Sequence, residues 1–329
     1  MVRNFQSFFL YCIILLVTNI TIGYAQYNTN LTVSLNEYTK ELDIKQEFTY
    51  FNKSNYNLGV IYFNDWANAY SDKNTALAKR FAQEFKKSLH LAKADERGKT
   101  TITSVVDETY NGLEWSRTEG KDIVKVTLKD ILPPGESTKI HITYKVKLPP
   151  NKYTPYGYDN KGDYYLKDWY LTPAVYDGKW HLYSNKNLED LYMDVTNTVI
   201  NFKFPDSLFL ASNFDITSES SFPNGQFAQL KGNLQRGGEI ILNPQKNFIT
   251  HRTPYMTFLT DFRAPRYSPI GQGLSINKVA NFIHNNLGDY PHEKILVSEL
   301  DYNKNPLYGI NQLPSFIRPY EEQFQFEMK

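Results

Sequence analysis

The sequence predicts a mainly β protein, an antiparallel β-sandwich followed by the beginning of an α+β domain. Apolar and polar residues alternate over long stretches, which is the pattern of strands that bury one face and expose the other. The chain contains 25 Tyr and 21 Phe among its 329 residues, and aromatic residues favour strands. Helical periodicity occurs in two segments only, and the second of them follows the strand-rich region.

The N-terminal segment has the pattern of a cleavable secretory signal. It begins with Arg3, continues with an apolar run over residues 8–17 and ends at the small residue Ala25. The apolar run is shorter than the roughly 20 residues that span a bilayer. We therefore expect residues 1–25 to be removed, the mature protein to be secreted or periplasmic, and no membrane span to remain.

Charge and cysteine usage narrow the possible functions. Lys and Arg number 36 against 35 acidic residues, so neither nucleic acid nor an anionic membrane surface is an expected partner. The single cysteine, Cys12, lies in the predicted signal. The mature protein is then expected to have no disulfide, no thiolate metal site and no cysteine nucleophile.

Period-two alternation predicts the individual strands. It runs from Leu42 to Tyr50, from Val124 to Leu128 and, after a Pro-Pro-Gly turn, from Ile140 to Val146. Further strands are expected at Val60–Phe63, Thr101–Val106, Met193–Phe204 and Leu208–Ala211. Within Met193–Phe204 the apolar positions change from odd to even numbers, which predicts a β-bulge.

Two segments have helical spacing instead. The first has apolar residues every four positions after possible caps at Asp72 and Asn74, and these residues are Leu77, Phe81, Phe85 and Leu89. The second follows Gly271 and Gly273, with Ser275 as a candidate cap, and its apolar residues are Ile276, Val279, Ile283 and Leu287. A change in composition over residues 251–269 predicts a domain boundary before this helix, and a strand is expected after it at Lys294–Val297.

The order of these elements resembles the N-terminal part of the aminopeptidase N-like family of zinc metallopeptidases. The segments that carry the resemblance are the hairpin Leu31–Phe51, Tyr170–Pro173 with Asn187–Val195, Phe202–Asn213, Tyr290-Pro291 with the strand Ile295–Leu300, and Asn305–Leu313. The resemblance extends from Asn30 to Arg318 and is one of layout, with few identical motifs. It implies a saddle-like β-sandwich domain over residues 26–250 and the truncated start of a thermolysin-like catalytic domain over residues 251–329.

The resemblance also implies where a peptide or protein substrate would bind. In the family, a G-x-M-E-N segment lies along the substrate, and its glutamate binds the free α-ammonium group. Gly309 matches the glycine of that segment, so Asn311 and Gln312 are expected beside the substrate, with Gln312 in place of the glutamate. A neutral amide cannot neutralise an ammonium group. Aminopeptidase specificity therefore does not follow from the resemblance.

The same family holds its zinc ion with two histidines one helical turn apart and uses the glutamate between them as general base. This chain contains one His-Glu pair, His292-Glu293, and Leu296 stands where the second histidine would be. We therefore expect no metal site and no cofactor in this chain, although the resemblance implies zinc in full-length relatives. Peptide hydrolysis by the chain alone is not expected.

An aromatic-rich loop leaves a different kind of function open. The loop lies between Tyr153 and Tyr183, and its aromatic residues include Tyr156, Trp169, Tyr170 and Trp180. Such rings can form a stacking platform for sugars or a cradle for a peptide, and they can equally fasten the loop onto the sandwich. The first interpretation predicts a secreted β-sandwich module that binds glycan or peptide through this loop.

Overall fold

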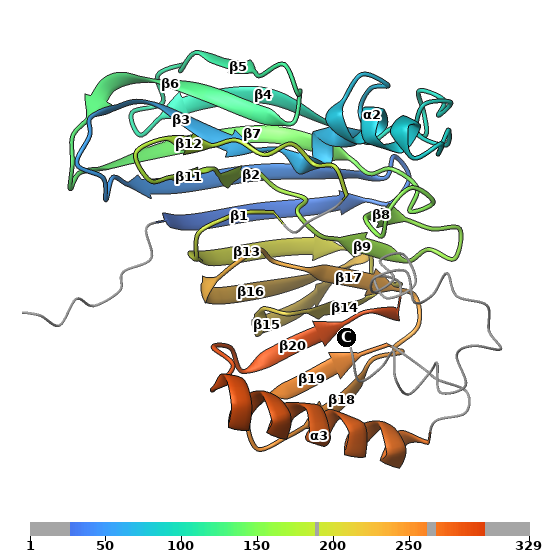
Figure 1. Cartoon of the computed structure of the whole chain (residues 1–329). Coiled ribbons are helices and arrows are strands. Elements are labelled where there is room, and N and C mark those ends of the chain that lie inside the picture. Colours follow the sequence, from blue (N-terminus) through green and yellow to red (C-terminus); the bar gives the residue numbers. More distant parts are fainter. Residues whose placement is uncertain (1–26, 188–190, 262–267, 300–329) are drawn as a thin grey trace, which may run out of the picture.

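The computed structural model describes residues 27–187, 191–261 and 268–299. Within these ranges the strands form one sheet of seven strands, two of four, one of three and one of two. Figure 1 shows the larger sheets layered against one another, with the helix α3 (Pro269–Leu287) at the far end of the molecule. The fold is mainly β and mainly antiparallel, as the alternation in the sequence predicts. The predicted signal, residues 1–25, lies outside the described residues.

Nearly all the regular elements are strands. The remaining helices are the 3-10 helix η1 (Trp66–Tyr70) and α2 (Ala76–Gln83). The strands are β1 (Tyr27–Asn36), β2 (Glu41–Phe51), β3 (Leu58–Asn64), β4 (Lys99–Asp107), β5 (Trp115–Arg117), β6 (Ile123–Leu132), β7 (Ser137–Lys147), β8 (Gly157–Tyr158), β9 (Tyr164–Leu166), β10 (Thr172–Pro173), β11 (Val175–Tyr176), β12 (Trp180–His181), β13 (Thr196–Phe204), β14 (Phe209–Ser212), β15 (Asp215–Phe222), β16 (Gly225–Gln235), β17 (Ile240–Asn243), β18 (Ile249–Arg252), β19 (Thr257–Thr260) and β20 (Lys294–Val297).

The predicted N-terminal hairpin is present and lies inside the seven-stranded sheet. Strands β1 and β2 pair antiparallel from Tyr27 opposite Tyr50 to Asn36 opposite Glu41. Their buried residues alternate with exposed or half-buried ones, because successive side chains of a strand point to opposite faces. The strand order of the sheet is β15-β16-β13-β1-β2-β7-β4, and β1 pairs parallel with β13.

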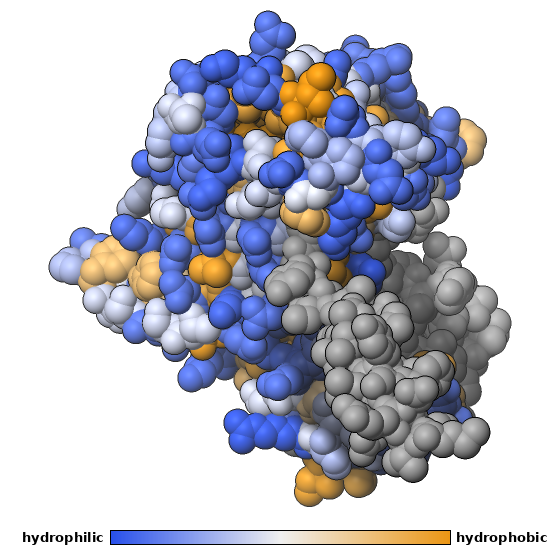
Figure 2. Space-filling view, turned by 90° about the vertical axis from the view of Figure 1, so that its left-hand side faces the viewer, coloured by the Kyte–Doolittle hydropathy of each residue, from blue (hydrophilic) through white to orange (hydrophobic). Residues whose placement is uncertain are grey.

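The main core lies between the seven-stranded sheet and the smaller sheets that cover one of its faces. The four-stranded sheet β10-β3-β6-β5 provides part of this cover. Phe48 of β2 and Phe63 of β3 meet edge to face with ring centroids 5.2 Å apart, and both are fully buried. Burial of this kind stabilises the fold by about 1.5–3 kcal/mol for each large apolar side chain. Figure 2 shows a face that is mostly hydrophilic and carries separate apolar patches.

The first predicted helix is present but shorter than its spacing suggests. Helix α2 begins after Thr75, whose hydroxyl accepts the N–H of Ala78, so Thr75 is the cap and the predicted caps at residues 72 and 74 are wrong. The helix ends before Phe85, which has φ of +60° and a side chain that is 92% exposed. The expectation that Phe85 belongs to the buried face of a helix is therefore wrong.

The second predicted helix begins earlier than the sequence interpretation has it. Helix α3 is capped by Ser268, whose hydroxyl accepts the N–H of Gly271. Ser275, the predicted cap, and both glycines lie inside the helix. Strand β20 follows where a strand is expected.

The bulge predicted in Met193–Phe204 occurs, but nearer the start of the strand. The pairing of β13 with β16 shifts register between Thr196 and Thr198. Met193 does not belong to the strand, and it packs with Trp66 and Leu191 in a small separate cluster. From residue 198 onward the even-numbered residues of β13 are buried. The odd-numbered Met193 breaks this pattern because it lies in the loop before the strand.

Among the described residues, no helix combines the length and the apolar character that crossing a bilayer requires.

Candidate functional site

The candidate site is the junction between the sandwich, residues 27–243, and a smaller body that we call the α3 unit, residues 249–299. The α3 unit is the three-stranded sheet β18-β19-β20 with helix α3 packed on it. Its core contains Met256, Phe258 and Ile276, with Ile295 and Val297 beside them. A mostly apolar cavity of about 70 Å³ lies among the side chains of Phe258, Thr260, Ile276, Val279, Ile283, Ile295 and Val297.

Strand β20 forms one edge of that sheet among the described strands. It runs parallel to β19, with Phe258 opposite Ile295 and Leu259 opposite Leu296. The backbone N–H of Thr257 donates to the carbonyl oxygen of Glu293 at 2.7 Å. Because backbone groups two residues apart face the same way, those of Ile295 face β19 and those of Leu296 face the opposite side. A peptide could therefore add to this edge through the backbone of Leu296.

A half-buried lysine ties the α3 unit to the sandwich at the start of β20. The Lys294 side chain is 18% exposed, and its Nζ atom lies 3.5 Å from Oδ1 of Asp215 and donates to the carbonyl oxygen of Phe214. Burial lowers the pKa of Lys294, although Asp215 acts in the opposite direction. These contacts join the edge strand to the first residues of β15, so the orientation of β20 depends on them.

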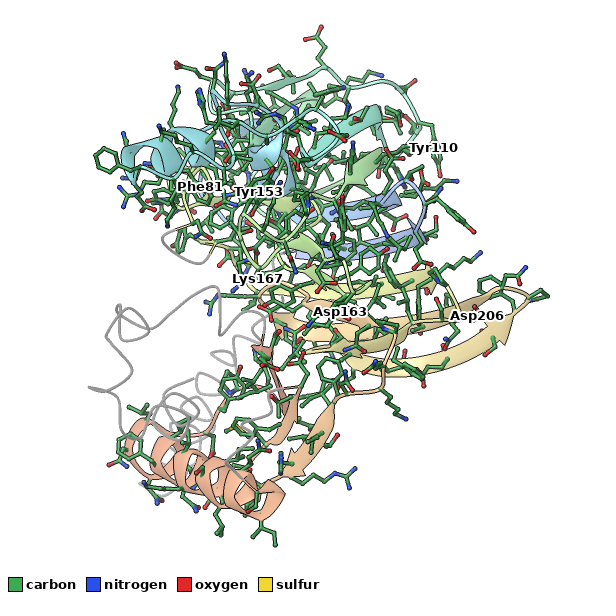
Figure 3. The ribbon with its side chains drawn as sticks, turned by 90° about the vertical axis from the view of Figure 1, so that its right-hand side faces the viewer. Phe81, Tyr110, Tyr153, Asp163, Lys167 and Asp206 are labelled. Atoms are coloured by element: carbon green, nitrogen blue, oxygen red, sulfur yellow. The ribbon has the colours of Figure 1, made fainter. Side chains whose placement is uncertain are left out.

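Carboxylates from both bodies face the same junction. Burial, followed in size by the charge of Asp159, raises the pKa of Asp163 to about 6, and Asp261 of the α3 unit adds to this shift. Burial likewise raises the pKa of Asp261, whose Oδ1 atom accepts the N–H of Glu299 at 2.8 Å. Figure 3 shows Asp163 and Lys167 at the border of the sandwich that faces the α3 unit. Asp163 can therefore exchange a proton in mildly acidic solution.

Lys167 takes part in a second set of contacts at this border. Its Nζ atom lies 3.6 Å from Oε1 of Glu239, and the hydroxyl of Tyr165 donates to Oε2 of Glu239 at 3.4 Å. Glu239 also raises the pKa of Tyr290, after the larger effect of burial. The charged groups of the junction thus come from sequence positions far apart. Among residues 27–187, 191–261 and 268–299, no three His, Cys, Asp or Glu side chains come together as a metal-binding group.

The residues predicted to contact substrate, Gly309, Asn311 and Gln312, lie outside the described residues. His292 lies at the junction but outside any strand, next to Tyr290, with ring centroids 5.6 Å apart. Burial and the charge of Arg236 lower its pKa. The sequence interpretation missed Asp163, Asp261 and Lys294. Single acidic or basic residues outside any motif give no signal of burial in the sequence, and the fold brings these three to the junction.

The aromatic-rich loop is fastened onto the sandwich. Tyr156, Trp169 and Tyr170 are 5%, 0% and 6% exposed. Tyr156 packs against Tyr70 with centroids 5.3 Å apart, and the indole N–H of Trp169 donates to the carbonyl oxygen of Gly238 at 2.9 Å. Three of the four rings proposed for a stacking platform are therefore buried, and a platform built on Trp169 is wrong for this fold. Trp180 is half-buried.

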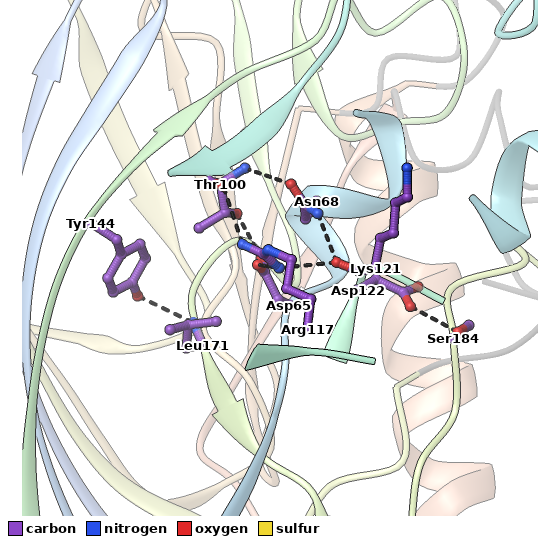
Figure 4. A network of polar contacts seen from close by, with 9 residues as sticks. All are labelled: Asp65, Asn68, Thr100, Arg117, Lys121, Asp122, Tyr144, Leu171 and Ser184. Atoms are coloured by element: carbon purple, nitrogen blue, oxygen red, sulfur yellow. Dashed lines mark hydrogen bonds and ion pairs between the residues drawn. The ribbon is translucent and has the colours of Figure 1, made fainter. Parts of the chain in front are cut away.

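A second polar cluster lies inside the sandwich, away from the junction (Figure 4). Asp65, which is 2% exposed, accepts from Nη1 of Arg117 at 2.5 Å and from the hydroxyl of Thr100 at 2.6 Å. Asp122 accepts from the hydroxyl of Ser184 at 2.7 Å. These bonds join η1 and the strands β4 and β5 to the loop after β12. The cluster therefore links separate segments of the sandwich to one another.

Comparison with known proteins gives a structural likeness only. No family model matches the chain, and no curated protein matches it. Among solved structures, it is similar to a two-domain M1 zinc metallopeptidase mutant bound to L-arginine, with a TM-score of 0.50 and 14% identity, over 83% of this chain and 56% of that chain. An M1 zinc metallopeptidase mutant from Deinococcus radiodurans gives the same values. The chain thus has the fold of the corresponding part of these proteins and spans 56% of their length.

Proposed function

We propose that this chain is the N-terminal portion of an exported zinc metallopeptidase and that it forms a wall of the peptide-binding cleft. The observation that carries the proposal is the edge strand β20, which is fixed against the sandwich by Lys294 and has outward-facing backbone groups at Leu296. The likeness in fold to M1 zinc metallopeptidases supports a peptidase-related role. The pattern of residues 1–25 supports export.

In this proposal the substrate is a peptide or protein segment that adds to β20 as a further strand. Backbone hydrogen bonds would supply affinity without selecting a sequence. Gly309, Asn311 and Gln312, which the resemblance assigns to substrate contact, would bind the same peptide. Gln312 can hydrogen bond to the start of a peptide but cannot pair with its ammonium charge.

Zinc belongs to the complete enzyme in this proposal, and this chain does not supply its ligands. The sequence contains no H-E-x-x-H, so it lacks the pair of histidines that would bind the metal and the glutamate that would activate a water molecule. The contribution of this chain is to align the peptide.

A hydrolysis assay tests whether this chain binds zinc and cleaves peptides by itself. The purified chain is incubated with one equivalent of zinc and with aminoacyl p-nitroanilides or a quenched fluorescent peptide. We expect no turnover above the buffer and no tightly bound zinc after dialysis. Turnover that a chelator abolishes would show that the chain holds its own metal centre.

Peptide binding tests the edge strand. Leu296→Pro removes the outward-facing N–H of β20 and leaves its bonds to β19, because proline is tolerated at an edge where the N–H faces outward. We expect this variant to bind a fluorescein-labelled Val-Thr-Val-Thr-Val peptide at least tenfold more weakly than the wild type does, as measured by fluorescence anisotropy. Leu296→Ala is the matched control, because it shortens the side chain and keeps the N–H. Equal binding by the wild type and Leu296→Pro, or no binding by the wild type, would rule out strand addition at β20.

A further inference from the structure

Three rings gather on the surface at the end of the aromatic-rich loop, and we call them the ring surface: His181, Tyr183 and Tyr192. The centroid of the His181 ring lies 6.0 Å from that of Tyr183 and 5.5 Å from that of Tyr192, and the two tyrosine rings are 6.2 Å apart. Tyr183 is 52% exposed and Tyr192 is 50% exposed. Each tyrosine therefore presents about half of its surface to solvent.

Contacts to neighbouring residues hold the ring surface in place. The indole N–H of Trp66 donates to the backbone oxygen of Tyr183 at 2.9 Å, and Trp66 is itself buried against the neighbours of Tyr192. The His181 ring is fixed by Asp177, whose Oδ1 atom lies 2.8 Å from Nε2 of His181. The other ring nitrogen lies 3.3 Å from the hydroxyl of Tyr183. Exposed rings in a fixed arrangement lose little entropy when a ligand binds.

The arrangement of the rings decides between classes of ligand. A cage for an alkylammonium ion needs a gap between the rings that the cation can fill. These rings contact one another, and Tyr183 and Tyr192 are nearly perpendicular, at 75°. What they offer is an open corner, in which a flat ligand can lie on one tyrosine while its edge meets the other.

The polar groups beside this corner favour a sugar over an apolar peptide. The faces of tyrosine rings carry partial negative charge from the ring quadrupole, which attracts the C–H groups of a pyranose ring. Asp177, with its side chain 56% exposed, can accept hydrogen bonds from neighbouring sugar hydroxyls through its carboxylate oxygens. The hydrogen bond with His181 lowers the pKa of Asp177, which keeps its carboxylate in the ionised form that accepts hydrogen bonds. A sugar carries hydroxyl donors beside its C–H face and can use both the rings and the carboxylate, whereas an apolar side chain can use the rings alone.

We propose that the ring surface binds pyranose units of a polysaccharide, by stacking on Tyr183 and Tyr192 and by hydrogen bonds to Asp177. This site is separate from the junction, and the proposal does not depend on the proposed peptidase function. It retains the sugar-binding interpretation of the aromatic-rich loop and moves it away from the buried Trp169.

Affinity electrophoresis tests the proposal with the full chain in native gels that contain β-glucan, xylan, mannan or soluble chitin derivatives. We expect at least one polysaccharide to retard the wild type. Loss of one ring is worth about threefold to tenfold in affinity, so Tyr183→Ala and Tyr192→Ala should each weaken retardation by that factor. The double variant should lose it.

Tyr38→Ala is the matched control, because Tyr38 is 98% exposed and is absent from the ring surface. It should be retarded like the wild type, and urea unfolding should show all variants folded. Tyr183→Phe keeps the ring and removes the hydroxyl that lies beside His181. If stacking on the ring is what binds the sugar, this variant should retain most of the retardation. Absence of retardation by every polysaccharide, or full retardation of the folded double variant, would overturn the proposal. The proposal would also be overturned if the double variant lost binding to the fluorescein-labelled peptide and kept its retardation by polysaccharide, because the surface would then bind peptides.

Discussion

Truncation of Trp169 measures how far the aromatic-rich loop holds the sandwich together. Its side chain is fully buried, and its ring lies edge-on to Tyr170 at 5.0 Å and to Phe202 of β13 at 6.2 Å. Replacement of a buried tryptophan by alanine removes its apolar contacts and leaves a cavity, which costs about 3–5 kcal/mol. The same change leaves the carbonyl oxygen of Gly238 without its indole donor. We therefore expect Trp169→Ala to lie near the upper end of that range.

Trp169→Phe separates packing from hydrogen bonding. Phenylalanine keeps most of the ring volume but cannot donate to Gly238, so the expected loss is about 1–3 kcal/mol for the unsatisfied carbonyl. Tyr38→Ala, at a fully exposed position, should stay within about 0.5 kcal/mol of the wild type. The expected order of stability is therefore the wild type and Tyr38→Ala first, Trp169→Phe next and Trp169→Ala last.

Urea unfolding followed by far-ultraviolet circular dichroism gives these values, because that signal does not depend on the tryptophan itself. An unchanged slope with urea and a lower midpoint would indicate a loss of stability in one native fold. A change below about 1 kcal/mol for Trp169→Ala would refute the burial argument and return this ring to the list of possible ligand contacts.

Three further outcomes are expected. Arg117→Ala should cost about 3–5 kcal/mol in urea unfolding, because it leaves the carboxylate of Asp65 buried without its partner, and a loss below 1 kcal/mol would contradict that role. Burial raises the pKa of Asp122 to about 6. Between about pH 4 and pH 6 the folded state therefore holds a proton that the unfolded state has lost. The free energy of unfolding should fall as pH rises through this range, by at most about 1.4 kcal/mol per pH unit from this group. Asp122→Asn should lack this fall in the free energy of unfolding, and identical pH profiles for the variant and the wild type would refute the argument. Limited thermolysin digestion should make its first cut within residues 251–329. This cut should be faster in Lys294→Ala, which loses the contact with Asp215, than in the exposed control Lys246→Ala. A first cut within residues 120–147 would contradict the prediction.

The strands could be predicted from the sequence because their signal is local. Each residue of β2 alternates between core and surface, so the pattern of Leu42, Ile44, Phe48 and Tyr50 records the burial directly. The end of α2 carried no such signal. Lys86 donates its N–H to the carbonyl oxygen of Phe81, and Phe85 donates to that of Ala82, which is the Schellman arrangement. Glycine usually occupies the left-handed position of this motif, and here Phe85 takes it.

The start of α3 is decided between two competing local signals in the sequence. Two glycines in the first turns cost about 1 kcal/mol each in helix propensity, so the sequence favours a start after them. The Ser268-Pro269 pair is a cap followed by a residue suited to the first helical position, and the sequence interpretation overlooked it. At Gly273 an added Cβ would lie 3.6 Å from Nδ1 of His251 in β18, which is an ordinary contact distance, so packing does not require glycine there.

The aromatic-rich loop could not be divided into core and surface from its composition. Its aromatic residues follow neither the period of a strand nor that of a helix, so their positions along the chain do not predict which side chains are buried. The division depends on distant segments: Gly238 lies 69 residues from Trp169 and accepts its indole N–H, whereas Tyr183 at the end of the loop remains half exposed. One loop can thus fasten itself to the sandwich with some rings and present others to a ligand. Measurements on Trp169 and on Tyr183 should therefore differ in kind: the first should change stability, and the second should change binding alone.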